Sequence, residues 1–155
     1  MILLQHHVGR LLEARFATPI DRTELEEFDR ERAAMRLLFA EERVVVMDFR
    51  RASILPPELA DRLVDLLQRP SPGLLRNGVL VPTTSPTVAM QLTRIVREGH
   101  SELRRVFRVA RELEVWLGEV LESAERRRLK LFLAEDAQFA SIPAARLKDS
   151  EPPAG

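Results

Sequence analysis

The chain has 155 residues, of which 45% are hydrophobic and 31% charged, a balance typical of a soluble globular domain and not of a disordered chain. Its formal net charge is +0, so we expect no general attraction to nucleic acid or anionic lipid. Cysteine is absent, which excludes disulfides, thiol nucleophiles and thiolate metal ligands.

The first 40 residues predict two strands and a helix. Residues 2–5 and 8–17 have the pattern of an opening strand pair, with the turn near His6-His7 or Gly9-Arg10. Thr23 and Glu26 have the spacing of a capping box and predict a helix that extends to about Phe39. Five side chains are predicted to face inward from this helix: Leu25, Phe28, Met35, Leu38 and Phe39.

The middle of the chain predicts a central strand and a second helix. Residues 43–48 contain an unbroken apolar run, Val44 to Met47, which is typical of a strand covered on both faces. A loop over residues 49–55 leads to a helix that begins at Pro57. The sequence Arg-Pro-Ser-Pro-Gly at 69–73 ends this helix.

Two further strand and helix pairs follow. Residues 78–81 predict a short strand, and Ser85 and Pro86 favour a helix start directly after it. Gly99 ends that helix, residues 104–109 predict the last strand, and Leu113 to Val120 form another helical stripe with Trp116 facing inward near Phe107. Residues 125–134 fit either a continuation of this helix or a separate one.

The order of these elements predicts an α/β fold, with a four- to five-stranded mixed sheet and about four helices packed on it. Several features of this order occur together in one known family: an apolar strand that ends in Asp48, a helix soon after it, the strand Gly-Val-Leu-Val-Pro at 78–82, and Phe107 followed by Trp116-Leu117. In these respects the chain resembles the STAS-like domains of bacteria. These are relatives of the anti-sigma factor antagonists and include the SpoIIAA-like branch, which shares its shape with CRAL-TRIO lipid-exchange domains.

The resemblance covers residues 2–121. It implies a STAS-like domain over residues 1–123 and a C-terminal extension over 124–155, first helical and then a partly disordered tail. Regulatory members of the family carry a phosphoacceptor serine at the start of the helix after the central strand. Pro56-Pro57-Glu58-Leu59 stand there in this chain, so the acceptor is missing, and Ser53 lies three residues earlier.

The same resemblance places a partner surface on the loop 50–55 and on the start of the helix after it. Its residues are Arg50, Arg51, Ser53, Ile54, Leu55 and Glu58, with Ile54 and Leu55 as apolar anchors and the charged side chains setting register. A second cluster is basic, and it fits either a solvated face balanced by glutamates or a protein interface. It consists of Arg94, Arg97, Arg104, Arg105, Arg108 and Arg111.

Thr83, Thr84 and Ser85 form a candidate anion-binding loop between a strand and a helix start, although capping by Ser85 explains most of this pattern. The histidines His6, His7 and His100 lack metal-site spacing, so we expect no metal. Asp48 ends the central strand, where α/β enzymes keep functional residues, and is expected to accept hydrogen bonds from the following loop. We therefore expect neither a cofactor nor enzymatic activity.

These observations favour a non-catalytic protein-interaction module in a bacterial signalling or regulatory complex, with a protein partner or a second copy bound and no nucleic acid. One alternative is a small-ligand or lipid carrier. Another is an assembly subunit that dimerises through Leu129, Leu131, Phe132 and Leu133. No apolar run approaches the roughly 20 residues of a spanning helix, and residues 1–4 are too short for a signal peptide, so we expect a cytoplasmic protein without membrane insertion.

Overall fold

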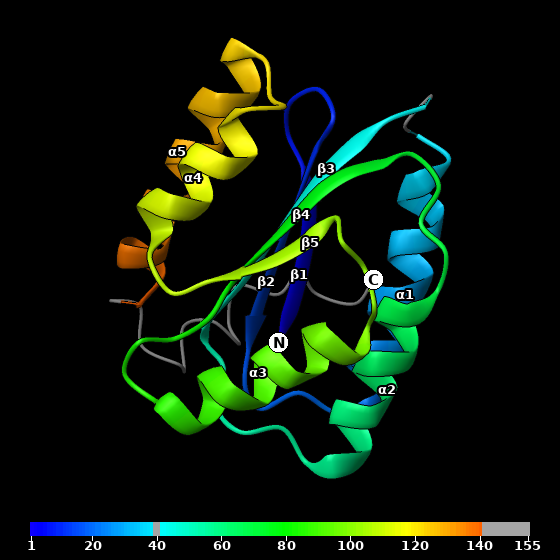
Figure 1. Ribbon diagram of the computed structural model, residues 1–155. Helices are drawn as coiled ribbons and strands as arrows, with labels where there is room; N and C mark the ends of the chain where they lie inside the picture. The colour runs from blue at the N-terminus through cyan, green and yellow to red at the C-terminus, as the bar shows by residue number, and fades with distance from the viewer. Residues whose placement is uncertain (39–40, 141–155) are drawn as a thin grey trace, which may run out of the picture.

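The computed structural model describes residues 1–38 and 41–140 and confirms the predicted α/β class (Figure 1). The described part contains a five-stranded mixed sheet and five helices. In chain order they are β1 (Ile2–His6), β2 (Leu11–Ala17), α1 (Arg22–Arg36), β3 (Arg43–Arg51), α2 (Pro57–Gln68), β4 (Leu74–Leu80), α3 (Pro86–Glu98), β5 (Arg104–Phe107), α4 (Ala110–Gly118) and α5 (Ser123–Ala140).

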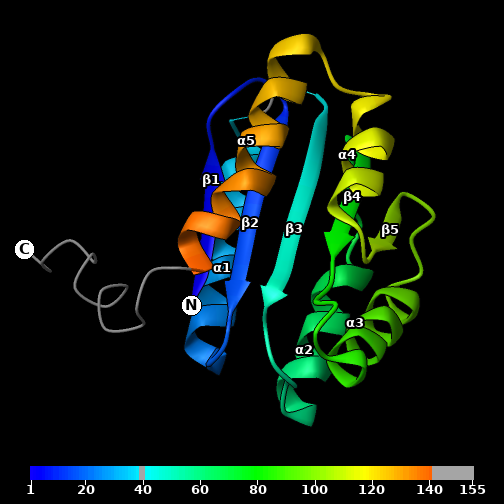
Figure 2. The ribbon, with the colours of Figure 1, turned by 90° about the vertical axis from the view of Figure 1, so that its left-hand side faces the viewer.

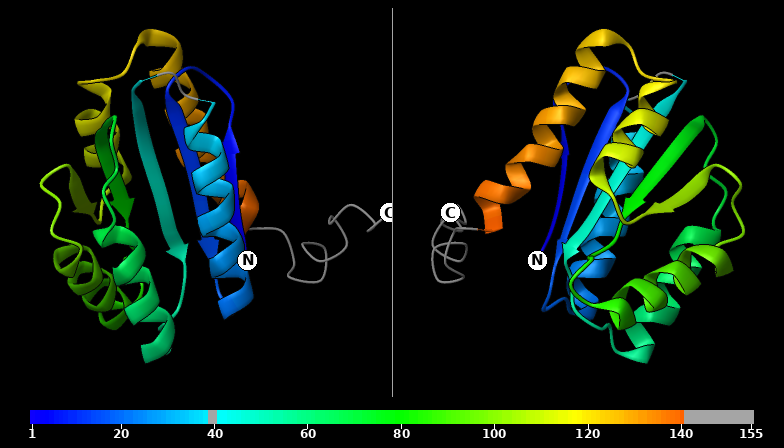
Figure 3. Two further views of the ribbon diagram at one scale, coloured as in Figure 1. Left: turned by 90° about the vertical axis from the view of Figure 1, so that its right-hand side faces the viewer. Right: turned by 60° about the vertical axis from the view of Figure 1, so that its left-hand side comes forward.

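The strands lie in the sheet in the same order as in the chain, β1-β2-β3-β4-β5. β1 is antiparallel to β2, and the other neighbours are parallel. The connecting helices α1, α2 and α3 all cover one face (Figure 3, left), whereas α4 and α5 cover the opposite face (Figure 2). The strand order therefore never reverses within the parallel part, and the sheet lacks the crevice at which doubly wound folds bind ligands.

The core beneath α1, α2 and α3 is apolar. Side chains alternate along the strands, so Leu12, Ala14 and Phe16 of β2 face this layer together with Val45, Met47 and Phe49 of β3. The Phe16 ring stacks on Phe49 with 4.1 Å between centroids and meets the edge of Phe28 at 5.3 Å. This layer holds the larger of the two cores.

The core beneath α4 and α5 combines apolar and charged side chains. Leu11, Val44 and Val46 of the sheet pack against Leu113, Leu117, Leu129 and Phe132 of the two helices. The next positions on the same strand faces are Glu13, Arg15 and Asp48, which are all buried. Arg128 of α5 donates to both carboxylate oxygens of Glu13, at 2.9 Å and 2.7 Å, and so pairs one of these charges.

The helix boundaries confirm some local predictions and correct others. α3 begins at Pro86 with Ser85 as its N-cap, as predicted, and α2 begins at Pro57. The capping box of α1 is formed by Asp21 and Glu24, so the prediction of Thr23 was wrong. This start places Leu25 and Phe28 in the core.

The C-terminal end of α1 and the extent of the last helix also differ from the prediction. The helix ends at Arg36, and Leu38, predicted to face inward, is 77% exposed. Phe39 and the tail from residue 141 lie outside the described residues. The ambiguous segment at 125–134 belongs to a separate helix, α5, which continues to Ala140. β3 and β4 are longer than predicted, and β5 ends at Phe107 instead of Val109.

Candidate functional site

An open groove of about 510 Å³ runs along the outer side of α3. The inner side of this helix is buried through Val88, Ala89, Leu92, Ile95 and Val96. The remaining positions recur at helical spacing on the outer side and form the groove together with Ile54 and Arg108 from two other segments. The groove is lined by Ile54, Thr87, Met90, Gln91, Thr93, Arg94, Arg97 and Arg108.

Two apolar side chains in the groove face solvent: Ile54 is 50% exposed and Met90 is 68% exposed. The loop that carries Ile54 is held against α3 through the next residue. The backbone N–H of Leu55 donates to the Gln91 side-chain oxygen at 2.8 Å, and the Gln91 amide donates back to the Leu55 carbonyl at 2.8 Å. These reciprocal bonds fix the position of Ile54 beside the helix, so the apolar surface is preorganised.

The charged groups in the groove are all cationic. Arg94 lies 3.9 Å from Glu98 in a pair whose two side chains are mostly exposed, which makes this pair weak. Arg97 and Arg108 are exposed and form no ion pair within residues 1–38 and 41–140. The groove thus offers two apolar contacts beside arginine side chains that can bind carboxylates.

The predicted partner surface is only partly available. Ser53, Ile54 and Glu58 are exposed, but Leu55 is only 5% exposed and packs into the core. Leu55 therefore cannot anchor a partner. The side chains of the neighbouring residues Ile54 and Leu55 point in different directions, and it is Ile54 that faces solvent. Arg50 and Arg51 are half-buried on β3, not in a loop.

Arg50 takes part in an internal charge network that also holds Asp48. The Asp48 carboxylate accepts hydrogen bonds, as predicted, but its donors lie on strands and not in a following loop: the Arg50 backbone N–H and the Arg50 and Arg15 guanidinium groups, at 3.0–3.1 Å. Arg50 donates further to the Leu133 carbonyl at 3.1 Å, and Arg15 donates to the Phe132 carbonyl at 2.5 Å. β3 continues to Arg51, so Asp48 lies within the strand and not at its end as predicted. Through Arg15 and Arg50 it joins the sheet to α5.

The candidate anion loop remains a prediction. Ser85 accepts from the Val88 backbone N–H at 3.4 Å and so serves as a helix cap. Thr83 and Thr84 are exposed. The histidines have other contacts: His6 lies 2.6 Å from the Gly9 carbonyl, and His7 lies 3.1 Å from Glu13. Among the described residues no group of three His, Asp or Glu side chains is placed to hold a metal ion.

Sequence reasoning identified Ile54 and the arginines of the groove separately and missed Met90 and Thr87. Residues 87, 90, 94 and 97 are spaced to lie on one side of a helix, and this spacing could have identified the groove.

No helix in the described part of the chain has the length and apolar character needed to cross a bilayer. No protein-family model, curated protein or solved structure matches the chain.

Proposed function

We propose that this chain is a non-catalytic protein-interaction module, and that the α3 groove binds an acidic segment of a partner protein. The observation that supports this proposal is the combination of exposed Ile54 and Met90 with Arg97 and Arg108, whose charges have no counterpart in the described part of the chain. Exposed apolar side chains rimmed by polar ones are typical of interaction surfaces, and arginine is enriched at interfaces.

In the proposed complex, apolar side chains of the partner cover Ile54 and Met90, and its carboxylates pair with the arginines. The apolar contacts supply most of the affinity, and the charges set register and accelerate association. Binding should therefore weaken as salt increases, because exposed charge pairs are screened. None of the groove-lining residues is aromatic, which disfavours a single-stranded nucleic acid, since its bases need stacking partners.

The resemblance to STAS-like domains supports a regulatory setting in the bacterial cytoplasm. In that setting this chain would bind its partner without the serine phosphoswitch, because Pro56 and Pro57 stand at the start of α2. Ser53 is exposed, but its hydroxyl lies 2.8 Å from the Thr18 hydroxyl, and Thr18 also accepts from the Ser53 backbone N–H. We expect no stoichiometric phosphate on Ser53 after incubation with cell extract and ATP.

Two alternative functions receive less support. A lipid carrier needs a chamber for an acyl chain, whereas two cavities lined mainly by core residues of the described part of the chain measure only about 30 Å³ and 10 Å³. Dimerisation through α5 needs its apolar side free, but Leu129, Phe132 and Leu133 are buried against the chain's own sheet. Only Leu131 of that predicted set is exposed, at 57%.

Site-specific crosslinking in the source organism tests the proposal. A photoreactive amino acid at Met90 should form an adduct with a discrete protein, and mass spectrometry should place the crosslink in an acidic segment that contains apolar residues. The matched control position is Leu131, which is similarly exposed on α5. Identical adducts from both positions, or none from Met90, would contradict the proposal.

Purified components then test the groove directly. Arg97→Glu should weaken binding of the captured segment by about tenfold or more, because it replaces an attractive charge with a repulsive one. Arg127→Glu makes the same charge change on the exposed side of α5 and should leave affinity unchanged. Equal losses from both variants would indicate a general charge effect and no specific groove.

A further inference from the structure

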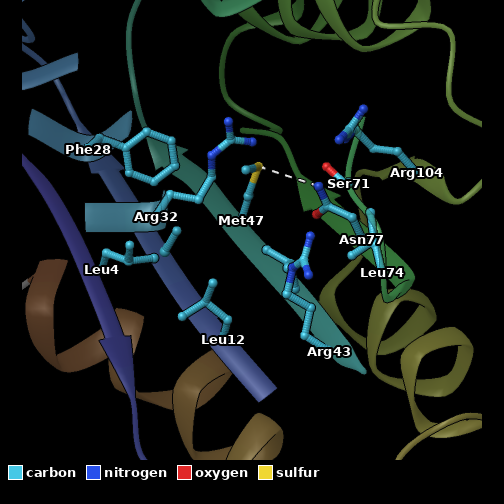
Figure 4. Close-up of a pocket in the computed structure, with 12 residues that line it drawn as sticks. Leu4, Leu12, Phe28, Arg32, Arg43, Met47, Ser71, Leu74, Asn77 and Arg104 are labelled. Atoms are coloured by element: carbon cyan, nitrogen blue, oxygen red, sulfur yellow. Dashed lines mark hydrogen bonds between the residues drawn. The ribbon is translucent and has the colours of Figure 1, made fainter. Parts of the chain in front are cut away.

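A small internal cavity lies beneath α1 at the end of the sheet where β3, β4 and β5 begin (Figure 4). Its volume is about 30 Å³, which is room for two or three water-sized groups. One wall is apolar and includes Leu4, Leu12 and Phe28. The other wall carries Arg32, Arg43, Ser71, Asn77 and Arg104.

Three arginines from three separate elements meet at this cavity. Arg32 comes from α1, Arg43 from the start of β3 and Arg104 from the start of β5, and Figure 4 shows them around Asn77 and Met47. Arg43 and Arg104 are only 7% and 8% exposed. Burying guanidinium groups without a counter-charge is unfavourable, so their convergence needs an explanation.

Hydrogen bonds within the described residues account for only part of the arginine donors. Arg104 donates to the Leu67 carbonyl at 3.3 Å, and Arg43 donates to the Pro72 carbonyl at 2.7 Å. These bonds give the two arginines a structural role in satisfying backbone carbonyls. Two buried donors at the cavity nevertheless have no partner in the described residues, the Nε–H groups of Arg32 and Arg104. The side-chain oxygen of Asn77 is also without a partner there, but it is an acceptor and does not itself attract an anion.

The cavity also lacks a compensating acid. None of the described residues that line it is Asp or Glu. Asp29 pairs with Arg32 at 3.1 Å but does not line the cavity, and it is shared with Arg69 at 2.6 Å. Burial, together with the charge of Arg32, lowers the pKa of Arg104 to about 10, and burial and the charges of Arg36 and Arg32 lower the pKa of Arg43.

The cavity adjoins a larger and more open pocket of about 190 Å³. Ser71, Leu74 and Arg104 line both spaces, so the two meet at these residues. The outer pocket is mostly polar and includes Gln68, Arg69, His100 and Ser101. A ligand that places an anionic group in the inner cavity would have its remaining atoms in this outer pocket.

We propose that Arg32, Arg43 and Arg104 bind a phosphate group, free or as part of a small phosphomonoester, and that the Ser71 hydroxyl completes its site. Guanidinium groups match the geometry of phosphate oxygens and bind them by charge-assisted hydrogen bonds. The space for two or three water-sized groups suits the terminal oxygens of a phosphate, and the outer pocket suits the rest of a small metabolite. This site is distinct from the partner groove on α3, with which it shares no lining residue.

Thermal unfolding in the presence of inorganic phosphate tests the inference. The Tm should rise by at least about 5 °C at phosphate concentrations near 100 times its Kd, because a ligand that binds only the folded state stabilises it. Sodium chloride at the same ionic strength is the control for screening. An equal Tm in phosphate and chloride at concentrations up to 50 mM overturns the inference. In a second measurement, the NMR chemical shift of the Arg104 Nε–H should change when phosphate is added and should not change with chloride.

Matched variants separate binding from structure. Arg104→Gln should weaken phosphate binding by at least about tenfold, whereas Arg127→Gln, on the exposed side of α5, should leave it unchanged. Asn77→Asp puts a carboxylate among the arginines. We expect it to raise the Tm without phosphate and to abolish the phosphate response, because the new charge takes the place of the anion. A lower Tm together with an intact phosphate response would overturn the inference.

Two probes distinguish the source of the phosphate. If the outer pocket holds the remainder of a metabolite, glucose 6-phosphate should bind more tightly than inorganic phosphate, and His100→Ala should remove that difference. If free phosphate is the ligand, inorganic phosphate should bind at least as tightly as the ester. Either result supports the arginine site. If neither inorganic phosphate nor glucose 6-phosphate binds, the inference is overturned.

Discussion

At the scale of single residues, Trp116 shows how charge and packing combine at a partly exposed position. Its ring meets Phe107 at 5.5 Å between centroids, with 44° between the planes. The guanidinium carbons of Arg76 and Arg105 each lie 4.8 Å from the ring centroid. The prediction that Trp116 lies near Phe107 is confirmed, but the side chain is half-buried and its loss should not unfold the protein.

Trp116→Ala should lower the free energy of unfolding by about 2 kcal/mol, less than for a fully buried aromatic, because part of the ring already faces solvent. Urea denaturation of both proteins measures this difference. Val115→Ala, at a 52% exposed position on the same helix, is the control and should change stability by less than about 0.5 kcal/mol. Equal stabilities for Trp116→Ala and the control would show that the ring serves contacts outside the chain.

A second residue-scale feature is the ion pair between Glu13 and Arg128. Glu13 is 1% exposed on β2, and Arg128 of α5 binds both of its oxygens. Glu13 and a half-exposed Glu135 together raise the pKa of Arg128, so the guanidinium stays charged. The pair connects a strand to a helix 115 residues away in the chain.

Arg128→Met should lower the free energy of unfolding by about 3 kcal/mol, because it removes both guanidinium hydrogen bonds from the buried Glu13 carboxylate and leaves it, among the described residues, only the His7 ring at 3.1 Å. The double variant Glu13→Met/Arg128→Met should regain most of that loss, since an apolar pair can replace a buried ion pair at little net cost. Chemical denaturation of the single and double variants gives the coupling energy. Additive losses would mean that the two side chains act independently.

At the scale of elements, the start of α5 is fixed to the β1–β2 turn. The Glu125 carboxylate accepts from the Arg10 backbone N–H at 2.6 Å, from the Arg10 guanidinium at 2.9 Å and from the Glu122 backbone N–H at 2.8 Å. Gly9 has φ +56°, and a Cβ there would lie 2.5 Å from the carboxylate. Glycine thus permits both the left-handed turn and the close approach of Glu125.

This contact should make the stability depend on pH. Burial acts to raise the pKa of Glu125, but the hydrogen bonds from Arg10 and the backbone outweigh burial and hold the pKa below its ordinary value. A depressed carboxyl pKa stabilises the fold above the unfolded-state pKa of about 4.3, and that stabilisation is lost as pH falls through the folded-state pKa.

Glu125→Gln should therefore be less stable than the parent protein at pH 7 and equally stable near pH 2. Urea midpoints measured across this pH range provide the test. Glu122→Gln changes an exposed neighbour, and its urea midpoint should depend on pH in the same way as that of the parent protein. A constant difference between Glu125→Gln and the parent at every pH would show that the carboxylate charge is not the source of the stabilisation.

At the scale of the whole molecule, α5 is part of the domain and not an appendage to it. The resemblance to STAS-like domains ended the domain at residue 123, yet α5 supplies Leu129, Phe132 and Leu133 to the second core. Its Arg128 also pairs with Glu13, and two of its backbone carbonyls accept hydrogen bonds from Arg15 and Arg50. α5 thus covers the chain's own sheet.

Truncation after Glu122 should lower the Tm by more than any of the point substitutions above. The truncation exposes the sheet face beneath α5 and removes the partners of buried charges. Each apolar side chain that is no longer buried should lower the free energy of unfolding by about 1.5–3 kcal/mol. Calorimetry measures the Tm, and sedimentation measures the oligomeric state, which should not change. A truncated protein that melts like the parent but shifts from dimer to monomer would favour the assembly role.

Local patterns account for the parts of the fold that could be predicted. The run Val44 to Met47 marks a buried strand, and Ser85-Pro86 marks a helix start, because each signal lies within a few residues. Where two local signals overlap, the sequence is ambiguous. Asp21/Glu24 and Thr23/Glu26 have the same capping-box spacing, and the start at Asp21 is the one observed with Leu25 and Phe28 buried in the core.

The candidate sites depend on contacts that no local pattern contains. Ile54 belongs to the groove because Leu55 bonds to Gln91, 36 residues later. The arginine cavity needs Arg32, Arg43 and Arg104 from three elements, and nothing in their sequence spacing shows that they meet. The same limit applies to Leu55, whose burial depends on the core beneath α2 and α3.

The sequence by itself determined the order of strands and helices, the α/β class and the absence of cysteine chemistry, because these follow from residue type and from periodicity over short windows. Only the tertiary structure decided which helices cover which face, that α5 completes the second core, and that buried charges on β2 and β3 find partners there. Each of these depends on side chains distant in the chain meeting in space, which apolar periodicity does not encode.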